Sequence, residues 1–455
     1  MNRRELLQTS AMVLAGSVLP VPLSGEKPEL NSHADVPRTN WSKNLRFSTD
    51  KVYAPANAAE AREVVLQSAR IKQLGSQHCF NNIADSRDAQ ISLRSLKGIE
   101  IDHAAQTATV GAGVRYGELA PVLDKAGFAL HNLASLPHIS VGGTIATATH
   151  GSGIGNKNLS TAVRALEILT ADGNTVSLSR EKDGDQFRLA VVHLGALGVL
   201  TRVTLDLLPR FDMSQVVYQN LSFDQLEHNL DAIMGAGYSV SLFTNLQGNS
   251  ASEVWIKDRA MVDAPQKQLP PTFYGATLQK QKLHPIVGNN AEACTEQMGS
   301  VGPWYLRMPH FKMEFTPSNG EELQTEYFID RKDGYRAVRA VEKLRDRITP
   351  HLFITELRTV AADDLPMSMA YRRDSLAIHF TWKPEEVVVR KLLPDIEAAL
   401  MPFNARPHWG KIFEVPGSYL QRQYPAMPQF RQLAAKLDPK GKFRNDYLSR
   451  NIFTA

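Results

Sequence analysis

Cysteine is scarce in this sequence, with only Cys79 and Cys294 among 455 residues. Neither has a second cysteine in CxxC spacing or a histidine at zinc-site spacing, so no cysteine-based metal cluster is expected. A disulfide between the two stays open. The histidines His138 and His150 are well separated in the chain and have no carboxylate close by in sequence, so we expect no metal site there either.

Long apolar runs and blocks of one charge are also missing. After roughly the first two dozen residues no apolar stretch is long enough to cross a bilayer, so no stable membrane span is expected. The 51 Lys and Arg residues nearly balance the 47 Asp and Glu residues. No dense basic block alternates with aromatics, which argues against a nucleic-acid partner. The length favours two globular domains.

The N-terminus is distinctive because Arg3 and Arg4 precede a short apolar stretch, Ala11 to Leu19. This pattern resembles a twin-arginine export signal, although no clear cleavage site follows it. We therefore expect residues 1–35 to be an export signal and linker that engages the twin-arginine machinery transiently. The protein would then be periplasmic or secreted. The alternative is an N-terminal helix that stays attached, which would leave the protein in the cytoplasm.

Short strands and turns dominate residues 36–210. A helix is expected to begin near Ala58, followed by a strand at residues 71–74 that runs into a loop holding His78. Two hairpins follow, the second turning at Asp172 and Gly173. The pattern favours an α+β fold with antiparallel meanders. The GxG at residues 111–113 does not open a helix after a first strand, which disfavours the classical dinucleotide fold.

Residues 133–160 are rich in glycine and other small residues. A surface linker is one interpretation, but a linker would be more charged. Small residues with free backbone N–H groups suit a loop that wraps a pyrophosphate. After Arg210 aromatics become commoner and prolines cluster, which predicts a second domain over residues 211–425. Residues 426–455 are expected to pack back towards the first domain.

Six motifs in the same order resemble those of the vanillyl-alcohol-oxidase family of FAD-dependent enzymes, within its aldonolactone and alditol oxidase group. They are GSQHCFN (75–81), SLPHISVGGTIATATHGSG (135–153), GALGVLTRVTL (195–205), ELRTVAADD (356–364), HFTWKP (379–384) and RPHWGKIF (406–413). The resemblance covers residues 38–455. It implies a two-domain α+β flavoprotein: an FAD-binding domain of mixed and antiparallel sheets with helices, and a substrate domain on a large antiparallel sheet flanked by helices.

The resemblance also implies how FAD is held. His78 matches the family histidine that carries FAD covalently, a link that makes the flavin a better hydride acceptor and prevents its loss outside the cell. The glycine-rich loop has no cysteine, so a single link is expected, and Cys79 is read as a packing residue that points away from His78. The implied cofactor-binding residues are Gln73, Leu74, Gly75, Ser76, Gln77, His78, Ser135, Ser140, Gly143, Thr147, Ala148, Thr149, His150 and Val199.

Pairs of polar residues two apart predict a substrate pocket. Glu356 and Arg358 would share one face of a strand, as would His379 and Thr381, and Lys411 follows a glycine. By resemblance, Ser135, Glu356, Arg358 and Thr381 would bind the hydroxyls of a polyol substrate. His379 and Lys411 would take the hydroxyl proton and stabilise developing charge, in an order that stays open.

The resemblance implies oxidation of a polyol such as xylitol or sorbitol at a terminal carbinol, with molecular oxygen reduced to hydrogen peroxide. Ala134, small and next to Ser135, would leave room for oxygen beside the flavin. Use of a quinone or cytochrome acceptor stays open. The alternatives are an oxidase of aldonolactones, such as gulono- or arabinono-1,4-lactone, and a flavin- or sugar-binding protein without turnover.

Overall fold

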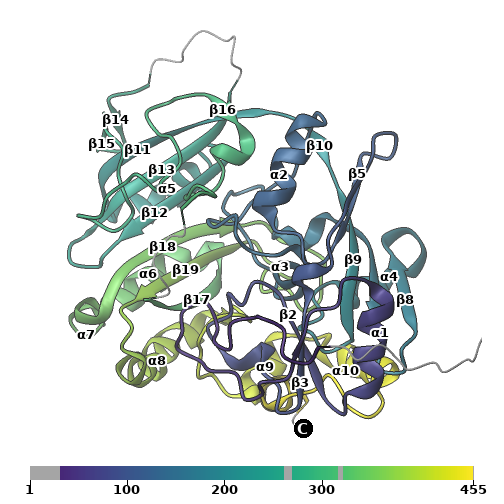
Figure 1. Ribbon diagram of the computed structural model, residues 1–455. Coiled ribbons are helices and arrows are strands. Elements are labelled where there is room, and N and C mark those ends of the chain that lie inside the picture. The colour runs from purple at the N-terminus through teal and green to yellow at the C-terminus, as the bar shows by residue number, and fades with distance from the viewer. Residues whose placement is uncertain (1–30, 261–268, 316–320, 454–455) are drawn as a thin grey trace, which may run out of the picture. The chain divides into compact units, whose positions relative to one another are not determined.

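The computed structural model describes residues 31–260, 269–315 and 321–453 (Figure 1). The described residues belong to one compact unit that begins at Asn31. The predicted export signal lies almost wholly in residues 1–30, outside the described residues, and stays a prediction. Among the described residues, no helix has the length and apolar character needed to cross a membrane.

Two main sheets lie in the first half of the chain. The smaller has the order β1-β3-β2 and the larger the order β4-β5-β9-β7-β8. Their strands are β1 (Val52–Tyr53), β2 (Ile71–Leu74), β3 (Ala89–Ser92), β4 (Ile99–Asp102), β5 (Thr107–Gly111), β7 (Val163–Leu169), β8 (Thr175–Ser179) and β9 (Val199–Asp206). The predicted hairpins are β4–β5 and β7–β8, both antiparallel.

The smaller sheet differs from the antiparallel meander that the sequence predicts, because β3 pairs in parallel with both β1 and β2. The reason is the crossover helix α1 (Ala58–Gln67), which carries the chain between β1 and β2 and buries Ala61, Val64 and Val65. The Asn57 side chain caps this helix by accepting from the backbone N–H of Glu60. The first half is therefore mixed, as the expected fold class states.

A ten-stranded antiparallel sheet occupies residues 212–407 of the described chain, in the order β14-β15-β11-β13-β12-β18-β19-β17-β20, with β16 also pairing β11. Its strands are β11 (Asp212–Ser222), β12 (Ser239–Thr244), β13 (Ser250–Ala260), β14 (Thr272–Phe273), β15 (Ala276–Leu278), β16 (Gly302–Pro303), β17 (Leu323–Asp330), β18 (Leu352–Val360), β19 (Ser375–Trp382) and β20 (Arg406–Pro407). The short β6 (Phe128–Ala129) and β10 (Leu208–Pro209) form a separate pair.

Helices complete the two halves and the C-terminal segment. They are α2 (Tyr116–Lys125), α3 (Val141–Ala146), α4 (Arg180–Val191), α5 (Asp224–Met234), α6 (Gly334–Glu342), α7 (Arg345–Ile348), α8 (Glu386–Leu400), α9 (Gly417–Gln423), α10 (Met427–Leu437) and α11 (Asp446–Leu448). Among them, α5 packs against β12, and α6 against β17 and β19. These helices cover a sheet face lined by large apolar side chains such as the stacked Phe380 and Trp382, whose ring centroids lie 5.1 Å apart.

The register of the three central strands puts polar residues in one row. On β19, His379 lies between Glu326 of β17 and Glu356 of β18. Residues directly opposite one another on neighbouring strands point to the same face of a sheet. Three ionisable side chains therefore share one face, while Phe380 and Trp382, which alternate with His379 and Thr381, are fully buried on the other.

The C-terminal segment, drawn in yellow in Figure 1, contacts the segment around β2. The backbone N–H of Ile71 donates to the carbonyl of Lys442 at 3.0 Å, and the Asn445 side chain donates to the carbonyls of Asn82 and Ile83. The contacts lie at the start of β2 and just beyond the His78 loop. They join the end of the chain to the segment that holds the predicted cofactor residues. The domain boundaries near residues 210 and 425 stay predictions.

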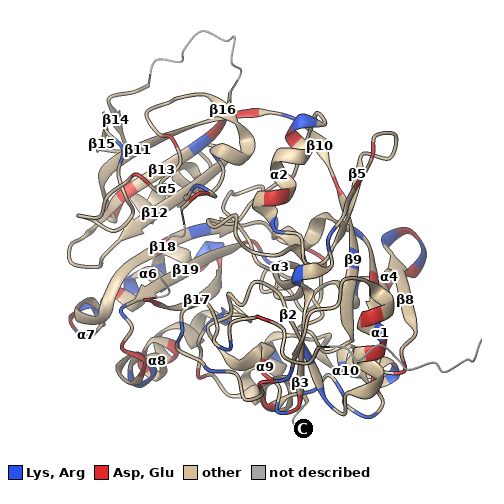
Figure 2. Ribbon diagram, in the orientation of Figure 1, with Lys and Arg blue, Asp and Glu red and all other residues tan. Residues whose placement is uncertain are grey.

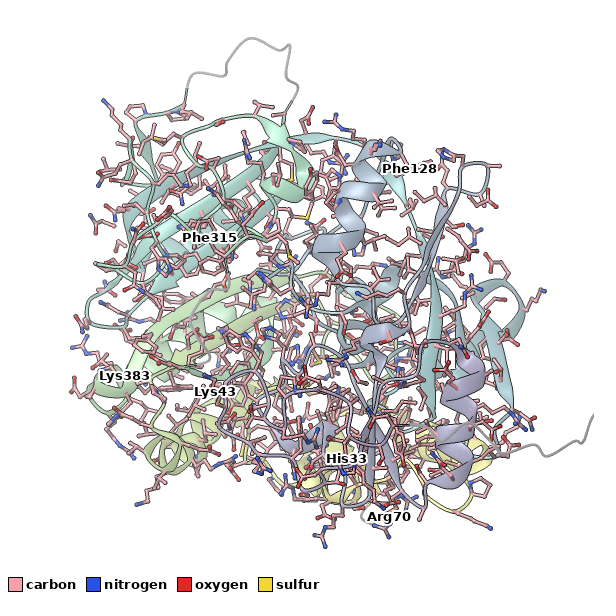
Figure 3. All side chains as sticks on the ribbon, in the orientation of Figure 1. His33, Lys43, Arg70, Phe128, Phe315 and Lys383 are labelled. Carbon is pink, nitrogen blue, oxygen red and sulfur yellow. The ribbon has the colours of Figure 1, made fainter. Side chains whose placement is uncertain are left out.

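Acidic and basic residues are interspersed along the helices and strands rather than segregated (Figure 2). Side chains fill most of the spaces that the ribbon leaves between its elements (Figure 3). One such cavity contains nearly all the predicted site residues.

Candidate active site

A cavity of about 320 Å³ lies among the His78 loop, the glycine-rich loop and the central strands of the large sheet. Its lining comes from segments far apart in the sequence: residues 72–84, 134–150, 322–326, 354–358, 379–381 and 408–411. The cofactor residues and the substrate residues that the sequence predicts therefore meet in one space. A cavity of this size, mostly apolar with a few polar groups, is typical of a small-molecule site.

His78 sits in a loop that follows β2, and Trp41 packs on it. The two rings are stacked, with centroids 4.5 Å apart and planes inclined by 25°. Two hydrogen bonds join the loops: the Trp41 N–H donates to the Gln77 carbonyl at 2.8 Å, and the Gln77 side chain donates to the Pro37 carbonyl at 2.7 Å. Burial, together with the positive charge of Lys411, lowers the pKa of His78 to about 3, so its imidazole is neutral.

Cys79 is among the residues that line the same cavity as His78. That its side chain points away from His78 stays a prediction. Gln77, just before His78, has a left-handed conformation with φ of 62°. Burial raises the pKa of the Cys79 thiol to about 11, so it is a thiol rather than a reactive thiolate at neutral pH. Cys79 and Cys294 are both free thiols.

The glycine-rich loop and the His78 loop approach each other closely. A Cβ added at Gly75 would lie 2.5 Å from Ser140 Oγ, and one at Gly143 would lie 3.2 Å from the same atom. Ser76 and Ser140 exchange hydrogen bonds, each backbone N–H donating to the other's hydroxyl at 3.2 Å. The cavity-lining Thr144 has a buried hydroxyl without a partner among the described residues. Bare backbone and an unpaired hydroxyl fit a bound cofactor such as FAD.

Most predicted cofactor residues line the cavity: Gln73, Gly75, Ser76, Gln77, His78, Ser135, Gly143, Thr147, Thr149 and His150. Four others lie behind it, namely Leu74, Ser140, Ala148 and Val199. Leu74 packs in a hydrophobic cluster with Val36, Phe47 and Val52. Val199 precedes Leu200, whose backbone N–H donates to the Gln73 side chain at 2.9 Å. These residues support the lining without forming it.

Glu356 and Arg358 on β18 both line the cavity and are both 6% exposed. Arg358 Nη1 donates to Ser135 Oγ at 3.4 Å, and Arg358 Nε lies 3.6 Å from Glu356 Oε2 without forming a hydrogen bond. Burial alone would raise the pKa of Glu356, but the charge of Arg358 and a hydrogen bond from His310 hold it well below its usual value. Glu356 is therefore a carboxylate.

His310 and Lys257 form a buried chain behind Glu356 that sequence reasoning missed. Lys257 Nζ donates to His310 Nδ1 at 3.0 Å, so the ring carries its hydrogen on Nε2, which donates to Glu356 Oε1 at 2.8 Å. Burial lowers the pKa of Lys257 to about 7 and that of His310 to about 4, so the histidine is neutral. His310 fixes one oxygen of Glu356, and no local motif marks it because only folding brings residues 310 and 356 together.

His379 and Thr381 on β19 complete the polar patch, with His379 Nε2 lying 3.3 Å from Thr381 Oγ1. Lys411 reaches the patch from the loop after β20 rather than from a strand. Its Nζ donates to Gln324 Oε1 and lies 4.7 Å from the centroid of the Phe80 ring. Burial lowers the pKa of Lys411 to about 8, against the opposing effect of Glu326.

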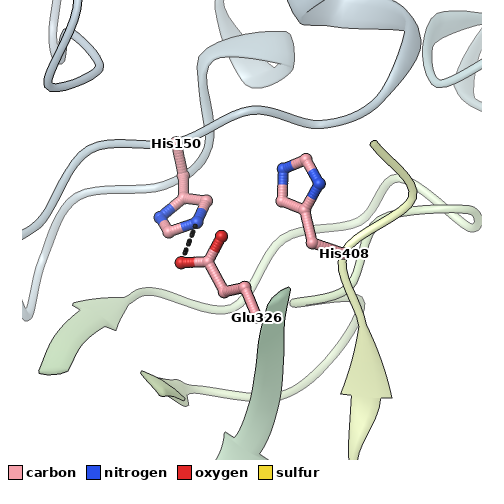
Figure 4. Close-up of side chains that lie close together, drawn as sticks. All are labelled: His150, Glu326 and His408. Atoms are coloured by element: carbon pink, nitrogen blue, oxygen red, sulfur yellow. Dashed lines mark ion pairs between the residues drawn. The ribbon is translucent and has the colours of Figure 1, made fainter. Parts of the chain in front are cut away.

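Glu326 on β17 is a second residue that sequence reasoning missed. Its carboxylate lies 3.2 Å from His150 Nε2, so the folded chain gives His150 a carboxylate neighbour that is not close by in sequence (Figure 4). With His408 they form a buried group whose ligand-type atoms all lie within 4.8 Å of one another. Tertiary structure brings Glu326 to His150 from 176 positions further along the chain.

Sequence comparisons agree with this geometry. Residues 49–179, which include His78, match the family described as FAD binding domain, and residues 312–451, which include the polar patch, match D-arabinono-1,4-lactone oxidase. An alditol oxidase of Streptomyces sp. is 43% identical over 415 residues, covering 90% of this chain and 97% of that protein. An L-gulono-1,4-lactone dehydrogenase of Mycobacterium tuberculosis is 29% identical, covering 90% of this chain and 98% of that protein.

The fold also has a solved counterpart. The structure of cholesterol oxidase from B. sterolicum superposes with a TM-score of 0.73 at 14% identity, covering 93% of this chain and 99% of that one. At this identity the likeness concerns the fold alone. Taken with the match along nearly the whole length of the Streptomyces enzyme, the chain belongs to the vanillyl-alcohol-oxidase family of FAD-dependent oxidoreductases, in its aldonolactone and alditol oxidase group.

Proposed function

We propose that the protein is an FAD-dependent alditol oxidase, which oxidises a terminal CH–OH of a polyol such as xylitol or sorbitol to the aldose and reduces oxygen to hydrogen peroxide. The observation that carries the proposal is the polar patch of Glu356, Arg358, His379 and Thr381 in the same cavity as the loop of His78. The likeness to an alditol oxidase along almost the whole chain supports the same substrate class.

The patch has the chemistry that a polyol needs. A buried hydroxyl without a partner costs about 1–3 kcal/mol, so each substrate hydroxyl must find a donor or an acceptor. Glu356 accepts through Oε2, because Oε1 is taken by His310. Arg358, which lines the cavity, can donate through its guanidinium. Thr381 can do either.

Oxidation of a carbinol also requires a proton acceptor and stabilisation of charge. Bound FAD supplies the hydride acceptor. His379 is neutral, because burial lowers its pKa despite the neighbouring Glu326, and can accept the hydroxyl proton. Lys411, with a pKa of about 8, is mostly protonated at neutral pH and can stabilise negative charge that develops in the reaction.

Anaerobic spectroscopy of the purified protein tests the proposal. Xylitol under argon should bleach the yellow oxidised flavin, and admission of air should restore the colour with release of hydrogen peroxide. A protein that only binds flavin or sugar would keep its colour. Bleaching without return of colour in air would point to another electron acceptor.

An aldonolactone oxidase is the second candidate, because residues 312–451 match the D-arabinono-1,4-lactone oxidase family. The two functions differ in substrate shape, since a lactone is a ring ester and a polyol is an open chain. A panel of alditols and 1,4-lactones scored by peroxide release separates them. The polyol proposal fails if lactones turn over and alditols do not.

We further propose that FAD is attached covalently through His78. The neutral imidazole held against Trp41 supports this, since only an unprotonated ring nitrogen can form the bond. Denatured protein should keep its yellow colour and fluoresce as a band in a gel, and His78→Ala should lose both. Cys79→Ser is the matched control and should keep the fluorescent band. Loss of all flavin from denatured wild-type protein would contradict a covalent link.

Oxygen access and export are two further parts of the proposal. Ala134 lines the cavity beside Ser135, where a small side chain leaves room for oxygen. Ala134→Leu should slow reoxidation of the reduced flavin by air while leaving its reduction by substrate unchanged.

Replacing Arg3 and Arg4 with lysine should keep folded, flavin-bearing protein in the cytoplasm, because the export receptor recognises the arginine pair itself. Unchanged periplasmic yield would instead mean that the segment is a retained helix.

A further inference from the structure

Glu326 is a buried carboxylate that contacts both the substrate patch and the candidate base. It is 1% exposed, and its position on β17 lies directly opposite His379 on β19. Its Oε1 accepts a 2.6 Å hydrogen bond from Arg358 Nη2, and its Oε2 lies 3.5 Å from His379 Nδ1. The carboxylate of Glu326 thus lies between Arg358, which is suited to bind substrate, and His379, which is suited to accept a proton from the substrate.

The ionisation of Glu326 decides what it can do to His379. Burial would raise the pKa of Glu326, but the charge of Arg358 beside it holds this pKa well below the usual value. An ionised carboxylate only accepts hydrogen bonds. The favourable tautomer of His379 therefore has its hydrogen on Nδ1, towards Glu326, and a lone pair on Nε2.

The lone pair on Nε2 is the one that a substrate could meet. His379 lines the cavity, and its Nε2 is 3.3 Å from the hydroxyl of Thr381, another lining residue. The 3.5 Å separation between Nδ1 and Glu326 is longer than a hydrogen bond, and Nδ1 has no other partner among the described residues. Such contacts in an active site commonly tighten when substrate binds.

A metal ion is the competing explanation for Glu326 between His150 and His408 (Figure 4). His408 Nδ1 already accepts a hydrogen bond from the backbone N–H of Gly410 at 3.0 Å. Burial keeps the pKa of His408 well below its usual value, so the ring is neutral and its hydrogen is on Nε2. Neither nitrogen of His408 then offers a free lone pair. The guanidinium of Arg358 at 2.6 Å from Glu326 also repels a cation.

We propose that Glu326 is a positioning residue that makes His379, rather than Lys411, the acceptor of the substrate proton. This inference rests on the proposed oxidation of a carbinol. In that step the O–H bond breaks and its proton passes to His379 Nε2, while the C–H bond breaks and its hydride passes to oxidised FAD. The carbonyl product forms, and Glu326 offsets the positive charge of the imidazolium. Oxygen would then take the two electrons together with two protons, the hydrogen delivered as hydride and the proton released by His379, and leave as hydrogen peroxide.

Other charges around His379 define the expected pH dependence. Glu326 on β17 and Glu356 on β18 favour the imidazolium, while Arg358 on β18 and Lys411 in the loop after β20 oppose it. The uncharged His408 packs nearby, and His150 faces Glu326 from the glycine-rich loop. Removing the charge of Glu326 therefore lowers the pKa of His379 further. The acidic limb of the rate profile, where His379 becomes protonated, should move to lower pH.

The test compares Glu326→Gln with Glu326→Asp by stopped-flow flavin reduction with xylitol across pH. Glutamine can donate to Nδ1 and so hold the hydrogen of His379 on Nε2, the wrong nitrogen. Its maximal rate should fall by about 10² or more, the scale of losing a general base, with the acidic limb at lower pH. Aspartate keeps the charge and should recover most of the rate and the wild-type limb.

Glu253→Gln is the matched control. Glu253 is also a buried glutamate on the large sheet, although burial raises its pKa to about 7; it accepts from Trp255 Nε1 at 2.7 Å and does not line the cavity among the described residues. This variant should keep the wild-type rate and profile. An unchanged rate and acidic limb in Glu326→Gln would overturn the proposal, as would an equal loss in Glu253→Gln.

A measurement without turnover keeps the proposal falsifiable if Glu326→Gln does not fold. ¹⁵N-histidine spectra of the wild-type holoenzyme report the tautomer of His379, whose signal is assigned by its loss in His379→Gln. Hydrogen on Nδ1 supports the proposal, and hydrogen on Nε2 overturns it. If no alditol bleaches the wild-type flavin, the proposed function fails, while the tautomer still shows whether Glu326 orients His379.

Discussion

Replacing Lys411 tests whether a positive charge in the cavity accelerates flavin reduction. Its Nζ is held by Gln324 Oε1 and the Phe80 ring, so it is preorganised and its removal is not compensated by water. Losing one such group typically costs about 10²–10³ in rate, or about 2.7–4 kcal/mol. Lys411→Met, which keeps the length of the side chain, should therefore slow flavin reduction by xylitol by a factor of about 10² or more.

The pH profile gives this prediction a direction. With a pKa of about 8, Lys411 loses its charge as pH rises through that value, so the wild-type rate should fall on the alkaline side there. Lys411→Arg keeps a positive charge at all accessible pH and should lack that limb even if its rate is lower. Stopped-flow measurement under argon isolates reduction from reoxidation by air. Wild-type rates in Lys411→Met, or an alkaline limb that persists in Lys411→Arg, would refute the reasoning.

Three further predictions concern binding. Glu356→Gln should raise KM for xylitol about tenfold or more with a smaller change in kcat, because Glu356 binds hydroxyls in the ground state and the transition state. Arg358→Met should raise KM and also lower kcat, because Arg358 in addition keeps Glu326 ionised beside His379. His310→Phe should raise KM in the same way, and His310→Gln should recover part of the loss because an amide can still donate to Glu356; equal KM values in the two variants would contradict this. Gly75→Ala should lower the flavin content per protein, measured by absorbance, because its Cβ would lie 2.5 Å from Ser140 Oγ.

Local patterns in the sequence were sufficient to predict the position of several helices and strands. The strand at Ile71–Leu74, the helix beginning at Ala58 and the hairpin around Gly173 all form where short-range signals predict them. Each depends on neighbours in sequence: alternating apolar residues, an Asn cap and a glycine with φ of 82°. The parallel pairing of β3 was not predicted, because it depends on where the crossover helix α1 returns the chain.

The polar pairs show where prediction from sequence ends. Alternation along a strand places Glu356 with Arg358 and His379 with Thr381, and the structure brings both pairs into one cavity. Lys411, which belongs to no such pair, reaches the cavity from the loop after β20. Cys79 lines the same cavity as His78, and the direction of its side chain stays a prediction.

By itself, the sequence determined the FAD-binding loop, the glycine-rich loop and the residue types of the substrate patch, because each is encoded within a short stretch of chain. Only the tertiary structure decided which charges face one another. Glu326, His310, Lys257 and Trp41 carry no local motif, and each acts on a residue at least 30 positions away, a proximity that exists only in the folded chain. The ionisation of the site follows from that proximity, since burial and neighbouring charge set each pKa.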